Sequence, residues 1–219
     1  MTETIFISGI DTDAGKSYAT GWIARKLAAE GKRVATVKFI QTGNQGHSED
    51  VDLHRRIMGT SLPEDVLGIT APIIFSYPAS AQLAARIDGR TIDLSHVDRS
   101  ISALSEAGYD VILVEGAGGL MVPITDDVLT IDYPVSRGLP VALVTNGRLG
   151  SISHTLLALH AIRTHTLSLK WLIYNEHFDS DPVISADTRG FLRRYVSTHF
   201  PEASIIVVPS FDPDRPDAK

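Results

Sequence analysis

The chain has 219 residues, no cysteine and a formal net charge of −6, and a chain of this length can bury the core of one α/β domain. Without cysteine it has no disulfide, thiolate zinc site or cysteine nucleophile, and the acidic balance disfavours general binding to nucleic acid. It shows no signal-peptide pattern and no apolar run near the roughly 20 residues that span a bilayer, so we expect a cytoplasmic protein with no membrane or nucleic-acid partner.

Short β-rich runs alternate with amphipathic segments along the chain. In chain order we expect a strand at 5–8, a helix at 16–30, a strand at 34–39, helices at 50–58, 80–87 and 95–107, strands at 109–115 and 140–145, a helix at 151–163, a strand at 169–174, a helix at 184–199 and a strand at 205–208. Residues 60–80, rich in Pro, Ser and Thr, are expected to form an ordered excursion.

This alternation, with strands that are apolar throughout, indicates the α/β class. It predicts one P-loop NTPase domain over residues 1–219, with a mostly parallel central sheet of about seven strands and helices on both faces. The polar tail at 212–219 contains two prolines and is expected to be flexible.

The strongest signal lies between the first strand and the first helix, where the sequence runs from Gly9 to Ser17 as GIDTDAGKS. Backbone N–H groups at such a junction point at a phosphate. Lys16 can neutralise the β- and γ-phosphates, and the Ser17 hydroxyl can ligate Mg²⁺. The alternative is an ordinary strand–turn–helix junction. The loop departs from the usual G-x-x-x-x-G-K-S/T because five residues separate Gly9 from Gly15 and Ile10 stands at the first-glycine position.

Further candidate ligands follow strand ends. Glu115 ends an apolar strand before a glycine-rich turn, at the edge where open α/β sheets place ligands, and could bind Mg²⁺. Lys38 ends the second strand and would emerge at the same edge, where an ammonium suits a γ-phosphate or a new anion beside it. Asp50 and Asp52 begin a helix, where acids are usually caps, but one of them could face Mg²⁺. The alternative for Glu115 is an acid that merely ends a strand before a flexible turn. The alternative for Lys38 is a solvated side chain with no ligand.

No other catalytic pattern is present. The chain shows neither a nucleophile elbow nor an H-E-x-x-H motif. Its histidines make no metal-ligand spacing, and we expect three of them, His47, His54 and His154, to be surface or structural residues.

Together these segments resemble the dethiobiotin synthetase family, the ATP-dependent carboxylases of biotin biosynthesis, over roughly residues 4–175. The matching parts are the long phosphate loop and residues 38–43, 114–119 and 149–154, and the five-residue spacing is the family's own form of the loop. The resemblance implies an ATP-dependent ligase that closes the cyclic urea of dethiobiotin. The substrates would be CO₂ and 7,8-diaminononanoate (7,8-diaminopelargonic acid), joined through a carbamate and a carbamic–phosphoric anhydride with release of ADP and phosphate.

The resemblance also implies roles for individual residues. Catalysis would depend on Lys16, Lys38 and Thr12. ATP would contact Asp13, Ala14, Gly15, Lys16, Ser17, Glu115 and Asn175, with no role assigned to position 18. The diamine substrate would contact Thr42, Ser80, Gly118, Leu149, Gly150, Ser151 and Ile152. Mg²⁺ would be held by Ser17, Asp50 and Glu115, with Asp52 as the alternative to Asp50.

A homodimer is implied as well, with residues 149–152 of the other subunit receiving the terminal carboxylate of the diamine at a helix N-terminus. Without the family, a plain helix start capped by Ser151 would be the preferred interpretation. Ser153 stands where the family commonly has Asn, which puts this carboxylate contact in question.

Two other functions are known for P-loop proteins of this broad group. An amide-forming synthase of cobalamin biosynthesis would need an ammonia source or an amidotransferase domain, for which 219 residues leave no room. A partitioning-type P-loop ATPase switch typically carries an additional lysine near the start of the loop, and residues 10–12 contain none.

Overall fold

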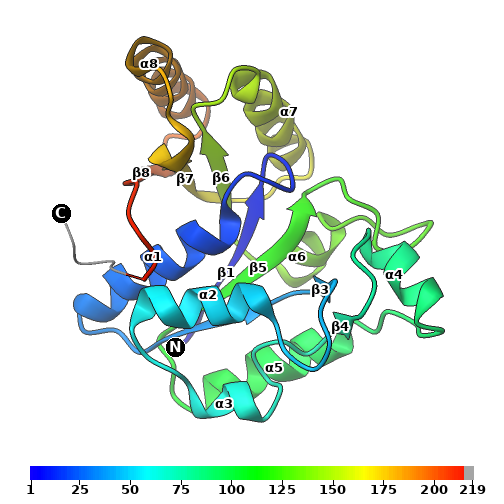
Figure 1. Cartoon of the computed structure of the whole chain (residues 1–219). Helices are drawn as coiled ribbons and strands as arrows, with labels where there is room; N and C mark the ends of the chain where they lie inside the picture. Colours follow the sequence, from blue (N-terminus) through cyan, green and yellow to red (C-terminus); the bar gives the residue numbers. More distant parts are fainter. Residues whose placement is uncertain (215–219) are drawn as a thin grey trace.

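The computed structural model of the chain describes residues 1–214 (Figure 1). Its strands are β1 (Glu3–Gly9), β2 (Val34–Lys38), β3 (Gln41–Thr42), β4 (Ile74–Phe75), β5 (Val111–Gly119), β6 (Val141–Asn146), β7 (Leu169–Asn175) and β8 (Ser204–Val208). Its helices are α1 (Lys16–Ala29), α2 (Glu49–Met58), α3 (Pro63–Val66), α4 (Ala81–Ile87), α5 (Ser95–Glu106), α6 (Asp132–Arg137), α7 (Ser151–Thr164) and α8 (Pro182–His199), with a 3₁₀ turn, η1 (Glu176–Phe178).

Six strands form one sheet in the order β2-β5-β1-β6-β7-β8, and every neighbouring pair is parallel. The α/β class and the mostly parallel sheet are therefore confirmed, and six strands are close to the predicted seven. Strands β3 and β4 make a separate two-stranded parallel sheet. Among the helices of residues 1–214, none is long and apolar enough to cross a membrane.

Alternate side chains of the strands point to opposite faces of the sheet, and helices cover both faces. On β1, Ile5 and Ile7 pack with α1 and α2, which lie side by side in front of the strands in Figure 1. Phe6 points to the other face, where α4, α5 and α6 pack against β2 and β5. Helices α7 and α8 cover β6 and β7 on that second face. Because both faces are buried, the middle of the strands is mostly apolar, with Thr36 of β2 as an exception, and polar residues lie mainly toward the strand ends.

The register of the strands brings those ends together at one edge of the sheet. Lys38 of β2 pairs with Glu115 of β5, which also pairs with Ile7 of β1. The strand predicted at 109–115 begins at Val111 and continues through the glycines to Gly119, because it keeps pairing with the end of β1 at Gly9. The phosphate loop, Lys38 and Glu115 are therefore neighbours.

The predicted elements differ from the structure mainly where the elements are short. The excursion at 60–80 is ordered, as predicted, and contains α3 and β4. Helix α6 and the pair β3–β4 were not predicted, because a two-residue strand or a six-residue helix is too short to show a period. Of the tail predicted to be flexible, Asp212 is exposed, residues 213 and 214 form a turn, and the rest lies outside the described residues.

Candidate active site

The phosphate loop between β1 and α1 is closed by two glycines that leave no room for a side chain. A Cβ on Gly9 would lie 2.8 Å from the carbonyl oxygen of Asp11, and one on Gly15 would lie 2.3 Å from Asn175 Nδ2. Gly15 also has a φ of +80°, which glycine adopts without strain. The loop therefore lies tightly against the start of α1, where free N–H groups can bind a phosphate.

Lys16 is the first residue of α1, and its side chain turns back along the loop. Its Nζ donates to the carbonyl oxygens of Asp11 at 2.9 Å and Thr12 at 3.1 Å. Burial lowers the pKa of Lys16, and the nearby Glu115 carboxylate only partly opposes this effect. A buried ammonium held by neutral carbonyls is ready to bind an anion.

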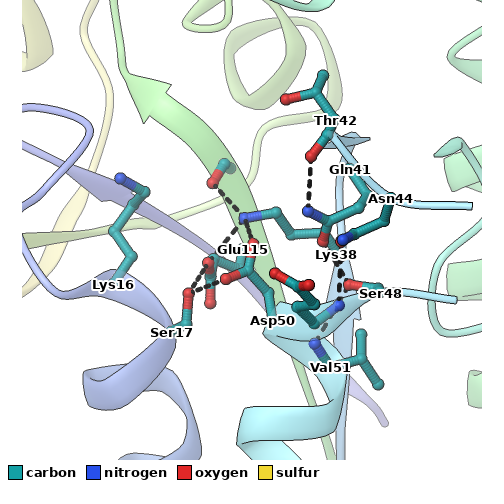
Figure 2. A network of polar contacts seen from close by, with 12 residues as sticks. Lys16, Ser17, Lys38, Gln41, Thr42, Asn44, Ser48, Asp50, Val51 and Glu115 are labelled. Carbon is teal, nitrogen blue, oxygen red and sulfur yellow. Dashed lines mark hydrogen bonds and ion pairs between the residues drawn. The ribbon is translucent and has the colours of Figure 1, made fainter. Parts of the chain in front are cut away.

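Three oxygen atoms meet on the other side of the loop (Figure 2). Ser17 Oγ lies 2.6 Å from Asp50 Oδ1 and 2.8 Å from Glu115 Oε1. The hydroxyl has one proton and can donate it to only one of the two carboxylates at a time. A hydroxyl and two carboxylate oxygens that converge in this way are ligands that Mg²⁺ prefers, so the residues fit the predicted metal.

The two candidate acids of α2 face different directions. Ser48 caps the helix by accepting a hydrogen bond from Val51 N at 3.2 Å, and this start turns Asp50 toward Ser17. The Asp52 side chain is 60% exposed and lies 3.8 Å from His47 Nε2. The position of Asp50, rather than that of Asp52, suits the predicted metal ligand.

Lys38 joins the two carboxylates from the side of β2. Its Nζ lies 2.5 Å from Asp50 Oδ2 and 2.9 Å from Glu115 Oε1. Burial alone would lower the pKa of Lys38, but Glu115 and Asp50 together raise it above the usual lysine value. Burial alone would likewise raise the pKa of Glu115, but Lys38 and His54 hold it far below the usual range. Both groups are therefore charged at neutral pH.

His54, to which the sequence assigns no chemistry, is fully buried beside this cluster. Its Nε2 lies 2.7 Å from Glu115 Oε2, and its Nδ1 lies 3.0 Å from Thr36 Oγ1. The spacing from Asp50 is the signal that could have revealed it, because residues four apart lie on the same face of a helix. No group of three or more His, Cys, Asp or Glu side chains within residues 1–214 could hold a metal by itself.

A cleft of about 530 Å³ joins these groups. It is lined by most of the predicted ATP and metal residues and by Thr42 and Gly118 of the predicted substrate set: Thr12, Asp13, Gly15, Lys16, Ser17, Thr42, Asp50, Glu115, Gly118 and Asn175. Ala14, within the loop, is fully buried. The cleft also has lining residues that the sequence did not indicate, among them Tyr18, Arg148, His177 and Phe178. Arg148 lies 3.9 Å over the Phe178 ring, and the two form one wall of the cleft.

The remaining predicted substrate residues lie elsewhere. Ser80 is an exposed residue at the start of α4, outside this cleft. Leu149, Gly150 and Ile152 line a separate cavity of about 380 Å³ between the N-terminal ends of α7 and α8. Leu149 is 91% exposed, whereas Ser151 is buried. A single chain therefore does not bring residues 149–152 to the cleft.

Comparison with known proteins gives consistent relationships. A family model described as "AAA domain" matches residues 3–209. The ATP-dependent dethiobiotin synthetase BioD 2 of Pasteurella multocida (strain Pm70) is 47% identical over 92% of this chain and 94% of the relative. BioD 2 of Haemophilus ducreyi is 44% identical over 95% of this chain and 99% of the relative. BioD of Chlorobaculum tepidum is 43% identical over 93% and 86%.

Solved structures that resemble this one include more distant proteins. Chloroplast FtsY from Physcomitrella patens aligns with a TM-score of 0.56 at 15% identity, over 98% of this chain and 60% of that one. FtsY from Thermotoga maritima aligns with a TM-score of 0.54 at 14% identity, over 98% and 66%. At such low identity the likeness concerns the fold alone.

Proposed function

The chain belongs to the family of ATP-dependent dethiobiotin synthetases, and we propose that its one P-loop domain closes the cyclic urea of dethiobiotin. The substrates are 7,8-diaminononanoate, CO₂ and ATP. One amine adds CO₂ and loses a proton, which gives a carbamate. A carbamate oxygen then attacks the γ-phosphorus, and ADP leaves. The second amine attacks the carbonyl carbon of the anhydride, phosphate leaves, and loss of a proton completes the ring.

The observation that carries the proposal is the group of buried charges where the phosphate loop meets the ends of β2 and β5. A carbamate and a triphosphate are both anions, so their reaction is opposed by electrostatic repulsion. Lys16 and Lys38 reach the cleft from two different elements, and both are almost completely buried. In such a site an ammonium stabilises developing negative charge far more than it does in water.

Each group has a separate task in this proposal. Lys16, with the loop residues Thr12, Asp13 and Gly15, binds the phosphates, while Lys38 faces the carbamate. Ser17, Asp50 and Glu115 would hold Mg²⁺, which when bound would neutralise charge on the β- and γ-phosphates. Asn175 would bind the adenine. Thr42 and Gly118 would line the path of the diamine.

We further propose that the active form is a homodimer. Residues 149–152 stand at the start of the long helix α7, where backbone N–H groups can bind a carboxylate. Within one chain they are separate from the cleft. A second subunit could bring its own α7 to the far end of a long substrate. Ser80 is still proposed to contact the diamine substrate. A cytoplasmic location remains a prediction.

The direct test supplies ATP, Mg²⁺, bicarbonate and diaminononanoate together and measures ADP. We expect ADP release that requires the diamine, with labelled bicarbonate incorporated into an acid-stable product. The acid step matters because a carbamate loses CO₂ in acid, whereas a cyclic urea does not. ADP release at the same rate without diamine would instead favour the alternative, a partitioning-type ATPase switch.

A further inference from the structure

Glu115 is held by hydrogen bonds on both of its oxygen atoms, and the two oxygens have different neighbours. Oε1 faces Ser17 and Lys38 in the cleft. Oε2 points away from the cleft and lies 2.7 Å from His54 Nε2. The side chains of His54 and Glu115 are both fully buried. Water therefore cannot replace this contact.

The other ring nitrogen of His54 makes a second contact, with the hydroxyl of Thr36. Thr36 Oγ1 accepts a hydrogen bond from Arg55 Nη1 at 2.8 Å, because a guanidinium can only donate. The hydroxyl keeps its own proton, which it can donate to His54 Nδ1, 3.0 Å away. When the hydroxyl donates to Nδ1, the neutral form of the ring carries its proton on Nε2 and can donate it to Glu115 Oε2. In that arrangement the hydrogen bonds from Arg55 to Glu115 all run in one direction.

The start of this series is also fixed in place. Arg55 forms a two-pronged ion pair with Asp65, with Nε and Nη2 each 2.8 Å from a carboxylate oxygen. Asp65 in turn accepts from Leu62 N and the Thr70 hydroxyl. A rigid carboxylate on α3 therefore holds Arg55, which orients Thr36, which orients His54.

We propose that His54 is a positioning residue that holds Glu115 with Oε1 facing the metal ion, and that Thr36 sets the tautomer in which His54 does so. This inference rests on the proposed role of Glu115 as a metal ligand. The physical reason is that a carboxylate bound through one oxygen only can rotate and present either atom. Partners of this kind typically change metal affinity by about ten- to a hundredfold when they are removed.

The test uses Mn²⁺ as a paramagnetic substitute for Mg²⁺, with a non-hydrolysable ATP analogue and the full-length protein. Free Mn²⁺ is measured by electron paramagnetic resonance, and binding of the analogue in EDTA is measured separately. The matched pair is His54→Gln and His54→Asn. A glutamine amide nitrogen reaches about as far as Nε2 and can donate to Glu115, whereas an asparagine reaches only toward Thr36.

We expect His54→Asn to weaken Mn²⁺ binding by about ten- to a hundredfold, while His54→Gln stays close to the wild type. Binding of the metal-free analogue should not change in either variant. This pattern would not follow from a general packing defect, which would affect both amides. Equal losses in the two variants, or no loss in His54→Asn, would overturn the proposal.

A second pair tests the role of Thr36 and decides the matter if the His54 variants do not fold. Thr36→Val keeps the shape but removes the hydroxyl, and Thr36→Ser keeps the hydroxyl. We expect weaker Mn²⁺ binding in Thr36→Val only, and equal affinities would contradict the proposal. If Glu115 is not a metal ligand at all, Glu115→Gln would leave Mn²⁺ binding unchanged. This result would separate failure of the proposed metal site from failure of the proposed role of His54.

Discussion

Lys16 and Lys38 are both buried ammonium groups, but their surroundings differ. Lys16 is held by two backbone carbonyls, and burial lowers its pKa. Lys38 is held by two carboxylates, which raise its pKa despite burial. The first lysine is therefore under-neutralised until an anion binds, whereas the second is already neutralised. Loss of each should have a different consequence for stability.

Lys16→Ala should abolish turnover, with a loss of at least about a hundredfold, and should leave the fold intact or slightly more stable. The reason is that it removes a buried charge that has no carboxylate bonded to it. Diamine-dependent ADP release and thermal unfolding measure the two effects. The exposed Lys32→Ala serves as control. Retained activity in Lys16→Ala would refute the role of the loop.

Lys38→Met should destabilise the ligand-free protein by about 3–5 kcal/mol, because it leaves the buried Glu115 without its cation. Mg²⁺ placed between Asp50 and Glu115 could replace part of that charge. We therefore expect added Mg²⁺ to raise the unfolding midpoint of Lys38→Met more than that of the wild type, as measured by urea titration. An equal rise in both proteins would argue against a metal at these carboxylates.

Much of the site could be predicted at this scale, but not all of it. Lys16, Ser17, Lys38 and Glu115 were predictable because each stands in a motif or at a strand end, and parallel strands end at one edge. The choice of Asp50 over Asp52 depends on how α2 packs, which a helix-start pattern does not determine. The contact of His54 depends on the same packing, and its neighbour Thr36 is an ordinary residue within β2.

At the scale of elements, α2 is the helix that joins the site to the rest of the fold. It carries Asp50 and His54 on the face toward the strand ends, and its Arg55 is tied to α3. Asp65 also bonds the backbone at the start of α3 through Leu62 N. One carboxylate thus connects α2, the start of α3 and, through Thr70, the loop before β4, so its charge should matter for stability.

Asp65→Asn should destabilise the protein by about 1.5–3 kcal/mol at pH 7, the usual range for hydrogen bonds to a charged group. Burial alone would raise the pKa of Asp65, but Arg55, Leu62 N and Thr70 together lower it. When the pKa of a carboxyl group is lower in the folded state than in the unfolded state, the ionised group stabilises the fold at pH values above its unfolded-state pKa. This stabilisation is lost as the pH falls through the folded-state pKa.

The difference between wild type and Asp65→Asn should accordingly shrink as pH falls below about 4. Urea unfolding at a series of pH values measures it. Asp52→Asn is the control, since its largely exposed side chain should change stability by no more than about 0.5 kcal/mol. If the difference in the free energy of unfolding between the two proteins stayed constant down to the lowest pH measured, the charge of Asp65 would not be the source of the stabilisation.

Long elements were predictable and short ones were not. The strands of the main sheet and helices such as α1 and α7 have enough residues to show an apolar run or a helical period. Helix α6 and the pair β3–β4 are shorter than one useful window, so their conformation depends on contacts with distant residues. Glycine-rich β5 extends beyond its apolar part because Gly9 provides a backbone to pair with.

At the scale of the molecule, one surface carries exposed apolar residues near the phosphate loop. Met121 and Leu157 are 53% and 66% exposed and line a hollow of about 410 Å³ beside Thr12. Exposed apolar patches of this kind often mark interfaces. Because this hollow is lined by the first four residues of the phosphate loop as well as by α7, it supports the proposal that a second subunit lies against α7.

Leu157→Asp should therefore shift the protein from dimer to monomer and reduce diamine-dependent ADP release, while ATP binding persists. Sedimentation and calorimetry measure the two properties. Leu67→Asp is the control, because Leu67 is 71% exposed at the end of α3 and lies outside this hollow. A wild-type protein that is fully active as a monomer would refute the dimer.

The strand order also has a consequence for synthesis on the ribosome. β1 lies between β5 and β6, and Gly9 at its end pairs with Gly119 and Val144. The phosphate loop is therefore made early but has no neighbouring strand until much later parts of the chain emerge. At roughly 5–20 residues per second, that delay is on the order of ten seconds. During this interval β1 and the phosphate loop that follows it lack the two neighbouring strands that the folded protein provides.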